Sequence, residues 1–281
     1  ELYQETLDSL SQTDAVVVIS AGNNGAWPAE SGRGYLYADD VNLHTGGAPG
    51  TYANAFTVGS VENAGITGLS FQAAGQDMVY VEGVGHYGDP MVTLDISEDG
   101  SGTQWEYLFL DGVGKPEDYA KIDVTDKVVF VSRGDTSFGD KLTAAGDAGA
   151  AACVIYNNEP GVPVTMDLSL SFAMIPCVMI MQRDAQVLRA ASTPVRDENG
   201  SVVGFTGEMT ISHKIAAEAI ESEYFTMSDF SSWGVPGDLS LKPEIIAPGG
   251  NIYSINGEVP ETDQYVLNSG TSMAAPQTAG I

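Results

Sequence analysis

The final segment of the chain, NSGTSMAAPQTAGI, holds a serine in a setting that could activate it as a nucleophile. Gly270 allows a tight backbone turn, and the residues after it predict a helix with Ser272 at its N-terminus. Unpaired N–H groups and the positive end of the helix dipole would favour a developing negative charge there. An ordinary N-cap serine fits the same pattern, so this segment alone leaves both interpretations open.

The neighbours of this serine are small. Thr271, Ala274 and Ala275 would let a carbonyl group approach the hydroxyl. Pro276 is expected within the first turn of the helix, where a missing N–H has little effect on stability.

A second candidate lies in the stretch VVVISAGNNG. Residues 15–19 are all apolar and predict a strand buried on both faces. Asn23 follows that strand, and the loops at the carboxyl ends of parallel strands carry function in α/β folds. The side-chain amide of Asn23, with Asn24 as its neighbour, could donate a hydrogen bond to an oxyanion. A turn asparagine that bonds to nearby backbone is the alternative interpretation.

Taken together, these segments resemble the subtilisin-like serine proteases, or subtilases. GTSMAAP is similar to the nucleophile motif of the family and AGNNG to its oxyanion-asparagine motif, while APGTYANAFTVGSV, FSSWG and LKPEIIAPGGNIYS resemble connecting segments, all in the family's order. The resemblance implies a serine endopeptidase that forms an acyl-enzyme on Ser272. Asn23 and the backbone N–H of Ser272 would form its oxyanion hole. Gln277 and Thr278 stand where the family most often has His-Val, which argues against a close match to the best-known secreted subtilisins.

The resemblance implies that the remainder of a catalytic triad is not in this sequence. A serine hydroxyl needs a histidine base, and that base needs an orienting carboxylate. In subtilases both precede the oxyanion asparagine, so the resemblance implies that the triad Asp and His lie upstream of residue 1. His44, His86 and His213 all follow Asn23 and stand in other contexts. We therefore expect an internal fragment of a longer protein that is inactive as a peptidase by itself.

The middle of the chain has a different texture, with short alternating strands and one strand–helix–strand unit. That unit, KVVFVSRGDTSFGDKLTAAGDAGAAACVIYNN, and the later MIPCVMIMQRDAQVL resemble a protease-associated (PA) domain. Phe138, Leu142 and Ala145 would form the apolar face of its helix, with Asp135 helping to cap it and with Gly146 and Gly149 weakening and ending it.

The predicted fold class is therefore α/β. A parallel-sheet, Rossmann-like catalytic domain (residues 1–61 and 228–281, the second part with the nucleophile) would be interrupted by a β-rich α/β PA domain (residues 62–227). This arrangement is similar to that of large cell-envelope subtilases, which implies an extracellular bacterial protein, secreted or attached to the cell wall. A non-catalytic PA-domain binding module and a pseudoprotease parent remain as alternatives.

The charge balance restricts the partners. The chain has 38 acidic and 11 basic residues, a formal net charge of −27, which argues against nucleic acid and anionic membranes. No apolar run is long enough for a membrane span. The resemblance to subtilases implies protein or peptide substrates as partners, and self-association through exposed sheet edges is a further expectation.

Two cysteines, Cys153 and Cys177, fit no metal motif. Two buried free thiols are favoured over one disulfide. The resemblance implies that catalysis requires no cofactor, and many subtilases bind calcium as a structural ion. The sequence leaves any metal site of this chain unknown.

Overall fold

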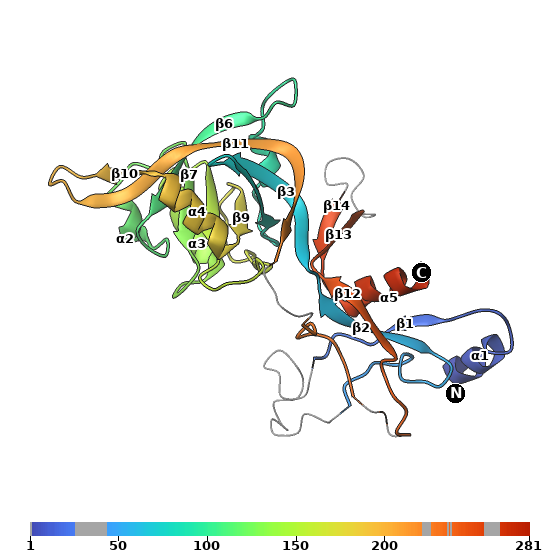
Figure 1. Cartoon of the computed structure of the whole chain (residues 1–281). Helices are drawn as coiled ribbons and strands as arrows, with labels where there is room; N and C mark the ends of the chain where they lie inside the picture. The colour runs from blue at the N-terminus through green and yellow to red at the C-terminus, as the bar shows by residue number, and fades with distance from the viewer. Residues whose placement is uncertain (1, 26–43, 221–225, 235, 237, 256–264) are drawn as a thin grey trace. The chain divides into compact units, whose positions relative to one another are not determined.

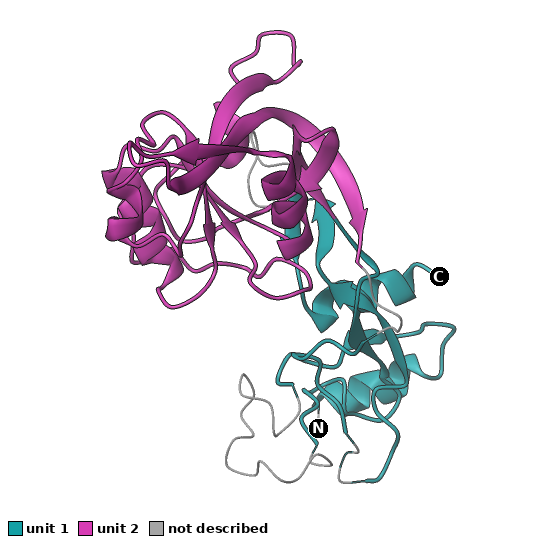
Figure 2. Ribbon diagram, turned by 60° about the vertical axis from the view of Figure 1, so that its left-hand side comes forward, with its two compact units in different colours: residues 1–66, 221–281 teal, residues 67–220 magenta. Residues whose placement is uncertain are grey.

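The computed structural model describes residues 2–25, 44–220, 226–234, 236, 238–255 and 265–281 (Figure 1). The chain forms two compact units (Figure 2): unit 1 consists of Glu1–Ile66 with Glu221–Ile281, and unit 2 of Thr67–Ile220. The predicted α/β class is confirmed, because strands and helices build both units and parallel pairs occur in the sheet of each. The domain boundaries after residues 61 and 227, and the identity of the middle part as a PA domain, stay predictions.

Unit 1 is built around a three-stranded parallel sheet with the order β1-β2-β12. Helix α5 contacts all three strands, and its alanines meet Val58 and Ala247 in a small apolar core. β13 and β14 form a separate antiparallel pair. The bounds are α1 (Leu2–Leu10), β1 (Val18–Ser20), β2 (Phe56–Glu62), β12 (Ile245–Gly250), β13 (Ile252–Ile255), β14 (Tyr265–Asn268) and α5 (Thr271–Ala279).

The strand predicted from residues 15–19 is shorter and less buried than expected. β1 covers only Val18–Ser20, which are half-buried, and Val16 is 73% exposed. Among the described residues β1 pairs with β2 alone, so it lies at an edge of its sheet. The prediction of a strand buried on both faces is therefore wrong, because an edge position leaves apolar residues uncovered. Self-association through such edges stays a prediction.

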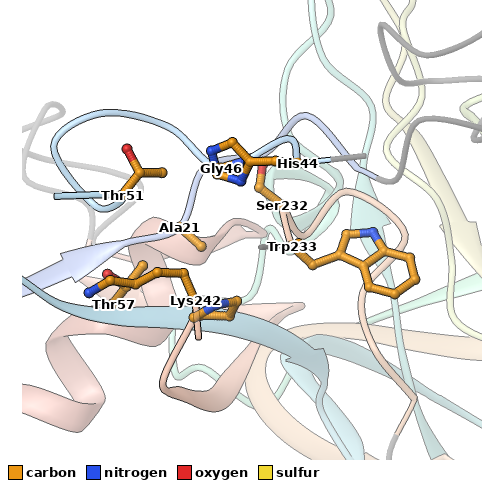
Figure 3. A pocket seen from close by; sticks show the side chains of 10 residues that line it. Ala21, His44, Gly46, Thr51, Thr57, Ser232, Trp233 and Lys242 are labelled. Carbon is orange, nitrogen blue, oxygen red and sulfur yellow. The ribbon is translucent and has the colours of Figure 1, made fainter. Parts of the chain in front are cut away.

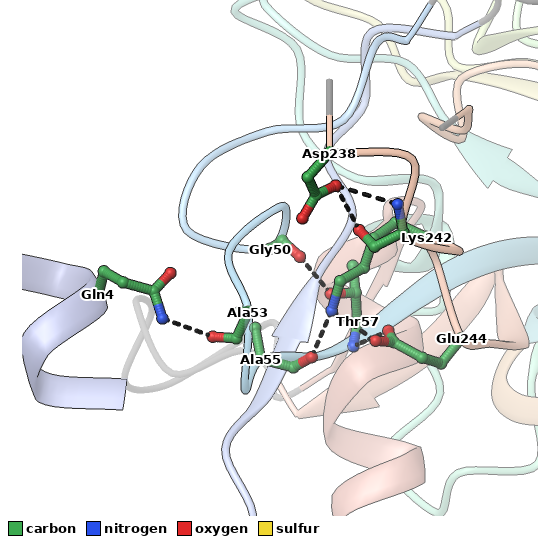
Figure 4. Close-up of polar contacts among 9 residues, drawn as sticks. Gln4, Gly50, Ala53, Ala55, Thr57, Asp238, Lys242 and Glu244 are labelled. Atoms are coloured by element: carbon green, nitrogen blue, oxygen red, sulfur yellow. Dashed lines mark hydrogen bonds and ion pairs between the residues drawn. The ribbon is translucent and has the colours of Figure 1, made fainter. Parts of the chain in front are cut away.

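A buried lysine ties the start of β2 to the segment before β12. Lys242 is only 8% exposed, and its Nζ donates to the Ala55 carbonyl at 2.6 Å and to the Glu244 carboxylate (Figure 4). Glu244 also accepts from the backbone N–H of Thr57 at 2.8 Å. A buried charge is tolerated only when it is paired and hydrogen-bonded in this way. The cluster therefore holds together the amino ends of β2 and β12, at the opposite end of these parallel strands from Asn23 and Gly249.

Unit 2 contains a nine-stranded sheet in the order β4-β3-β11-β6-β7-β8-β9-β5, with β10 paired to β11. Its centre, from β6 to β9, is parallel, whereas the β4–β3, β11–β6 and β9–β5 pairs are antiparallel. The bounds are β3 (Gly65–Ala73), β4 (Gln76–Val79), β5 (Val81–Glu82), the 3-10 helix η2 (Met91–Leu94), β6 (Thr103–Leu110), α2 (Pro116–Tyr119), β7 (Val128–Ser132), α3 (Phe138–Asp147), β8 (Ala152–Tyr156), β9 (Cys177–Ile180), α4 (Gln182–Ala191), β10 (Thr193–Arg196) and β11 (Val202–Ala219).

Strand β7 illustrates how this sheet is buried on both faces. Val128 and Phe130 belong to one apolar cluster together with residues of α4. Val129 and Val131 belong to a second cluster together with residues of α3. Alternate residues of a strand point to opposite faces, so a continuous apolar run fits a strand that is covered on both sides.

Helix α3 has the predicted apolar face but a different cap. Leu142 and Ala145 are fully buried, and Phe138 packs against the same cluster. The N-cap is Ser137, whose Oγ accepts from the Asp140 N–H at 3.1 Å. Asp135 lies too far before the first helical residue to reach that turn, so the prediction that it helps to cap the helix is wrong.

Gly149 ends the helix as predicted, in a left-handed conformation (φ +82°) directly after the C-cap, whereas Gly146 lies within the helix and does not end it. Cys153 on β8 and Cys177 on β9 are free, fully buried thiols paired in register across the sheet. The hydrogen bond with Cys153, together with burial, raises the pKa of Cys177.

Candidate active site

Ser272 is the second residue of α5, which begins at Thr271 after Gly270 as N-cap. Its side chain is exposed, and neither its hydroxyl nor its backbone N–H has a hydrogen-bond partner among the described residues. The interpretation of Ser272 as the N-cap is therefore wrong, because the helix starts one residue earlier. What this position provides is a hydroxyl in the first helical turn, where the dipole favours negative charge.

The small neighbours of Ser272 pack inward. Thr271, Ala274 and Ala275 are buried, and the two alanines contact Val58 of β2 in the core of unit 1. Their small size allows α5 to lie close to the sheet, which differs from the expected role of admitting a carbonyl group. Pro276 lies in the second turn, since the helix begins at Thr271, so its expected first-turn position is wrong.

Asn23 stands in the turn that follows β1 and reaches the start of α5. Its Oδ1 accepts from both the backbone N–H and the hydroxyl of Thr271, each at 2.9 Å. An N–H can only donate, so the amide must turn its oxygen toward Thr271 and its Nδ2 away. Nδ2 makes no hydrogen bond to any described residue, and the side chain is exposed. Asn24 instead donates its Nδ2 to the Thr45 carbonyl at 3.3 Å.

The two donors without a partner, Asn23 Nδ2 and the backbone N–H of Ser272, both lie close to Gly270. A Cβ built on Gly270 would lie 3.1 Å from Asn23 Nδ2 and 3.7 Å from the backbone N of Ser272. The missing side chain of Gly270 therefore leaves an open position next to both donors. Two N–H donors close to one position beside a serine hydroxyl are the groups that an oxyanion hole requires.

The start of α5 is held against the end of β12. The Gly270 N–H donates to the Gly249 carbonyl at 2.8 Å. A Cβ on Gly249 would lie 2.6 Å from the Gly270 carbonyl oxygen, so only glycine permits this approach. The APGG portion of the connecting segment therefore has a physical purpose, which is to bring the helix start down onto the sheet.

Two residues of the site were missed by sequence reasoning. Thr271 was expected only to be small, yet it fixes the orientation of the Asn23 amide. Ser232, in the FSSWG segment, contacts the turn around Asn23 from the other side. Local patterns carry no signal for these roles, because the partners are more than 200 residues apart in the chain.

The histidines make no hydrogen bond to Ser272. His44 lines a small pocket together with Ala21, Ser232 and Trp233 (Figure 3). His86 belongs to unit 2, where partial burial lowers its pKa, and the exposed His213 belongs to unit 2 as well. The absence of the triad base from these residues stays a prediction.

Within the described part of the chain, no group of three or more His, Cys, Asp or Glu residues is placed to hold a metal ion. A structural calcium ion therefore stays a prediction. No described helix is long and apolar enough to cross a membrane.

Unit 1 thus combines a parallel sheet, a glycine turn and a helix that begins beside a serine and an asparagine amide, in an α/β protein. The sequence profile of the subtilase family, Peptidase S8, matches residues 2–281. The chain belongs to the subtilase family.

Its relatives include bacterial peptidases. The chain is 32% identical to the PI-type proteinase of Lactococcus lactis subsp. cremoris over 98% of this chain and 14% of that protein. It is 31% identical to the C5a peptidase of Streptococcus pyogenes serotype M3 over 63% of this chain and 13% of that protein. The chain thus spans about a seventh of the length of the curated relatives it matches.

Solved structures overlap loosely with the chain. A psychrophilic subtilisin-like protease, Apa1, from Pseudoalteromonas sp. AS-11 is 13% identical over 99% of this chain and 55% of that one, with a TM-score of 0.46. A zinc aminopeptidase from Bacillus subtilis is 24% identical over 62% of this chain and 35% of that one, with a TM-score of 0.39. Structural similarity at these TM-scores and identities supports no conclusion about function.

Proposed function

We propose that this chain supplies the nucleophile and the oxyanion hole of a serine endopeptidase that acts on protein or peptide substrates. The observation that carries the proposal is the set of unengaged groups at the start of α5. The Ser272 hydroxyl, the Ser272 N–H and the Asn23 Nδ2 have no partners among the described residues, and both donors lie around Gly270. A helix N-terminus with free donors is suited to binding a negatively charged oxygen.

The chemistry follows from these positions. Ser272 Oγ attacks the carbonyl carbon of the scissile peptide, and its proton passes to a histidine base. The carbonyl oxygen becomes an oxyanion that accepts hydrogen bonds from Asn23 Nδ2 and the Ser272 N–H. Collapse of this intermediate breaks the C–N bond, and the base returns the proton to the leaving amine. Water then hydrolyses the acyl-enzyme and frees Ser272.

The histidine base and its orienting carboxylate are proposed to come from sequence upstream of residue 1, as the subtilase motifs imply. The 281 residues alone are then proposed to be inactive, because an unassisted serine hydroxyl is a weak nucleophile at neutral pH.

Unit 2 is proposed to be a PA domain with a non-catalytic role, such as a lid or a substrate-binding surface. The parallel centre of its sheet between α3 and α4 supports an independent α/β domain. An extracellular location on a bacterial cell, secreted or wall-attached, is proposed because the relatives are peptidases of Lactococcus and Streptococcus and the chain is strongly acidic.

The direct test is labelling of the full-length protein with a fluorophosphonate probe, which reacts with activated serines. We expect labelling that Ser272→Ala abolishes and Ser269→Ala leaves unchanged. Ser269 is a suitable control because it is a nearby exposed serine whose Oγ already accepts from the Asn251 N–H at 2.8 Å. A folded full-length protein without Ser272-dependent labelling would refute the proposal and favour a pseudoprotease or a PA-domain binding module.

The inactivity of the isolated chain needs its own measurement. The purified 281-residue chain is expected to leave fluorescein-labelled casein uncut. Casein hydrolysis by this chain that disappears in Ser272→Ala would show that the base is supplied from within it.

A further inference from the structure

The turn that carries Asn23 is bonded to a buried serine of the FSSWG segment, and the Phe230 carbonyl of that segment accepts from the Gly25 N–H at 2.8 Å. Ser232 is 0% exposed, and its backbone N–H donates to the Gly22 carbonyl at 2.9 Å. Its Oγ accepts from the Asn24 N–H at 3.0 Å. These two hydrogen bonds bracket Asn23 on both sides along the chain.

Asn23 depends on these neighbours for its position. Its own backbone N–H and carbonyl make no hydrogen bond among the described residues, so its backbone is held through its neighbours Gly22 and Asn24 and through its side-chain bonds to Thr271, whose Oγ1 also accepts from the Gly22 N–H at 3.1 Å. Gly22 adopts φ +103°, and a Cβ there would lie 3.1 Å from Ser232 Oγ. Ser232 therefore packs directly against the turn and also bonds to it.

We propose that Ser232 is a positioning residue for the oxyanion hole, acting through Asn23. It sets the backbone of the turn, while Thr271 sets the rotation of the Asn23 amide, so that together they determine where Nδ2 points. This inference rests on the proposed function of Asn23 and Ser272. It assigns a catalytic consequence to the FSSWG segment, whose serines make no hydrogen bond to Ser272.

The physical reason is the strict geometry of oxyanion stabilisation. A donor is effective only when it lies about 2.7–3.1 Å from the position that the oxyanion will occupy. Loss of the Ser232 hydroxyl frees the Asn24 N–H and loosens one side of the turn. Nδ2 then spends time away from its effective position, which weakens binding of the transition state more than binding of the ground state.

The neighbouring serine provides a matched control. Ser231 is 2% exposed, and its Oγ accepts from the Ser60 N–H at 2.9 Å. Ser231→Ala and Ser232→Ala thus each delete one buried hydroxyl that accepts from a backbone N–H. Only Ser232 is bonded to the turn around Asn23, so only its loss should affect the reaction.

The experiment measures phosphonylation of Ser272 in the full-length protein by a fluorophosphonate probe, which needs no knowledge of cleavage specificity. The maximal rate constant and the half-saturating concentration are determined for wild type, Ser231→Ala, Ser232→Ala, Asn23→Ala and Asn23→Ala/Ser232→Ala. Ser232→Cys is added because its larger sulfur fills the site and accepts a weaker, longer hydrogen bond. This variant keeps the series interpretable if Ser232→Ala does not fold.

We expect Ser232→Ala to lower the maximal rate by about tenfold or more, without exceeding the about 10²–10³ that loss of one oxyanion donor costs. Ser232→Cys should lie between it and wild type. The half-saturating concentration should hardly change in either variant, and Ser231→Ala should react like wild type. In the Asn23→Ala background, Ser232→Ala should have no further effect, because the group it positions is already gone.

Three outcomes would overturn the inference. Ser232→Ala and Ser232→Cys could both react like wild type while Asn23→Ala is slow, which leaves the proposed function standing and removes only the role of Ser232. The effects of Asn23→Ala and Ser232→Ala could multiply in the double variant, which would mean that Ser232 acts elsewhere. Unchanged rates in Asn23→Ala would instead count against the proposed oxyanion hole itself.

Discussion

Two substitutions of Asn23 should separate what its side chain does for the fold from what it does for the reaction. Asn23→Ala removes both the acceptor used by Thr271 and the free donor Nδ2. Asn23→Asp keeps oxygen acceptors for the Thr271 N–H and hydroxyl but replaces the donor with a second oxygen that carries negative charge. The two variants therefore remove the same donor and differ in the acceptor.

The expected magnitudes follow from the contacts. Asn23→Ala loses two hydrogen bonds to the buried Thr271, each contributing about 0.5–1.5 kcal/mol, so the free energy of unfolding should fall by about 1–3 kcal/mol. Asn23→Asp should be at least as stable as wild type, because a carboxylate beside a helix N-terminus adds about 0.3–1 kcal/mol.

The catalytic rates of the two variants should follow the opposite order from their stabilities, with Asn23→Ala faster than Asn23→Asp. Loss of one oxyanion donor lowers kcat by about 10²–10³, which we expect for Asn23→Ala in the full-length protein. Asn23→Asp should be slower still, since its charge repels the oxyanion. Thermal unfolding and hydrolysis of a quenched fluorescent peptide measure the two quantities. If Asn23→Asp is more active than Asn23→Ala, or if Asn23→Ala stays within about fivefold of wild type, the assignment of Nδ2 as a donor is wrong.

Two further predictions concern the helix start and unit 2. Gly270→Ala should reduce kcat by about tenfold or more, because its Cβ would lie 3.1 Å from Asn23 Nδ2 and a shift of about 1 Å in a catalytic group can cost 10²-fold. Gly280→Ala is the control, since its Cβ would meet only helix carbonyls at 3.6 Å. Equal activity of the two variants would contradict the geometry. In unit 2, burial and the neighbouring Glu218 raise the pKa of Asp184 to about 7, above its unfolded value. Between about pH 4 and pH 7 the folded unit therefore keeps a proton on Asp184 that the unfolded chain has released. The stability that this proton contributes is lost as the pH rises through that range. The melting temperature of wild type should therefore fall relative to that of Asp184→Asn over this range, and a difference that does not change with pH would show that Asp184 is ionised throughout.

Local sequence features predicted much of the secondary structure correctly. The apolar run around Phe130 is the first strand of the predicted strand–helix–strand unit, and the spacing of Leu142 and Ala145 marks the buried side of α3. These predictions succeeded because periodicity reports directly which faces of an element are covered. The similar run at residues 15–19 gave a wrong prediction of burial, because the burial of this strand depends on neighbouring strands that local sequence does not specify.

Local sequence also predicted part of the candidate site and left the rest to the tertiary structure. Ser272 and Asn23 were identifiable from their motifs, since a glycine before a serine and an asparagine turn after a strand are local patterns. The first residue of α5 was not, because the choice between Gly270 and Ser272 as N-cap depends on the Gly249 carbonyl that holds the helix start. That contact joins segments which only the fold brings together.

By itself, the sequence determined that this chain is an α/β protein of the subtilase family with a serine at a helix start and an asparagine at the end of a strand. Only the tertiary structure decided which atoms of those residues are free. The Asn23 amide is bonded to Thr271, and the backbone on either side of Asn23 is bonded to Ser232, two partners more than 200 residues away along the chain. Hydrogen bonds of this kind depend on distance in space, and no local pattern encodes them.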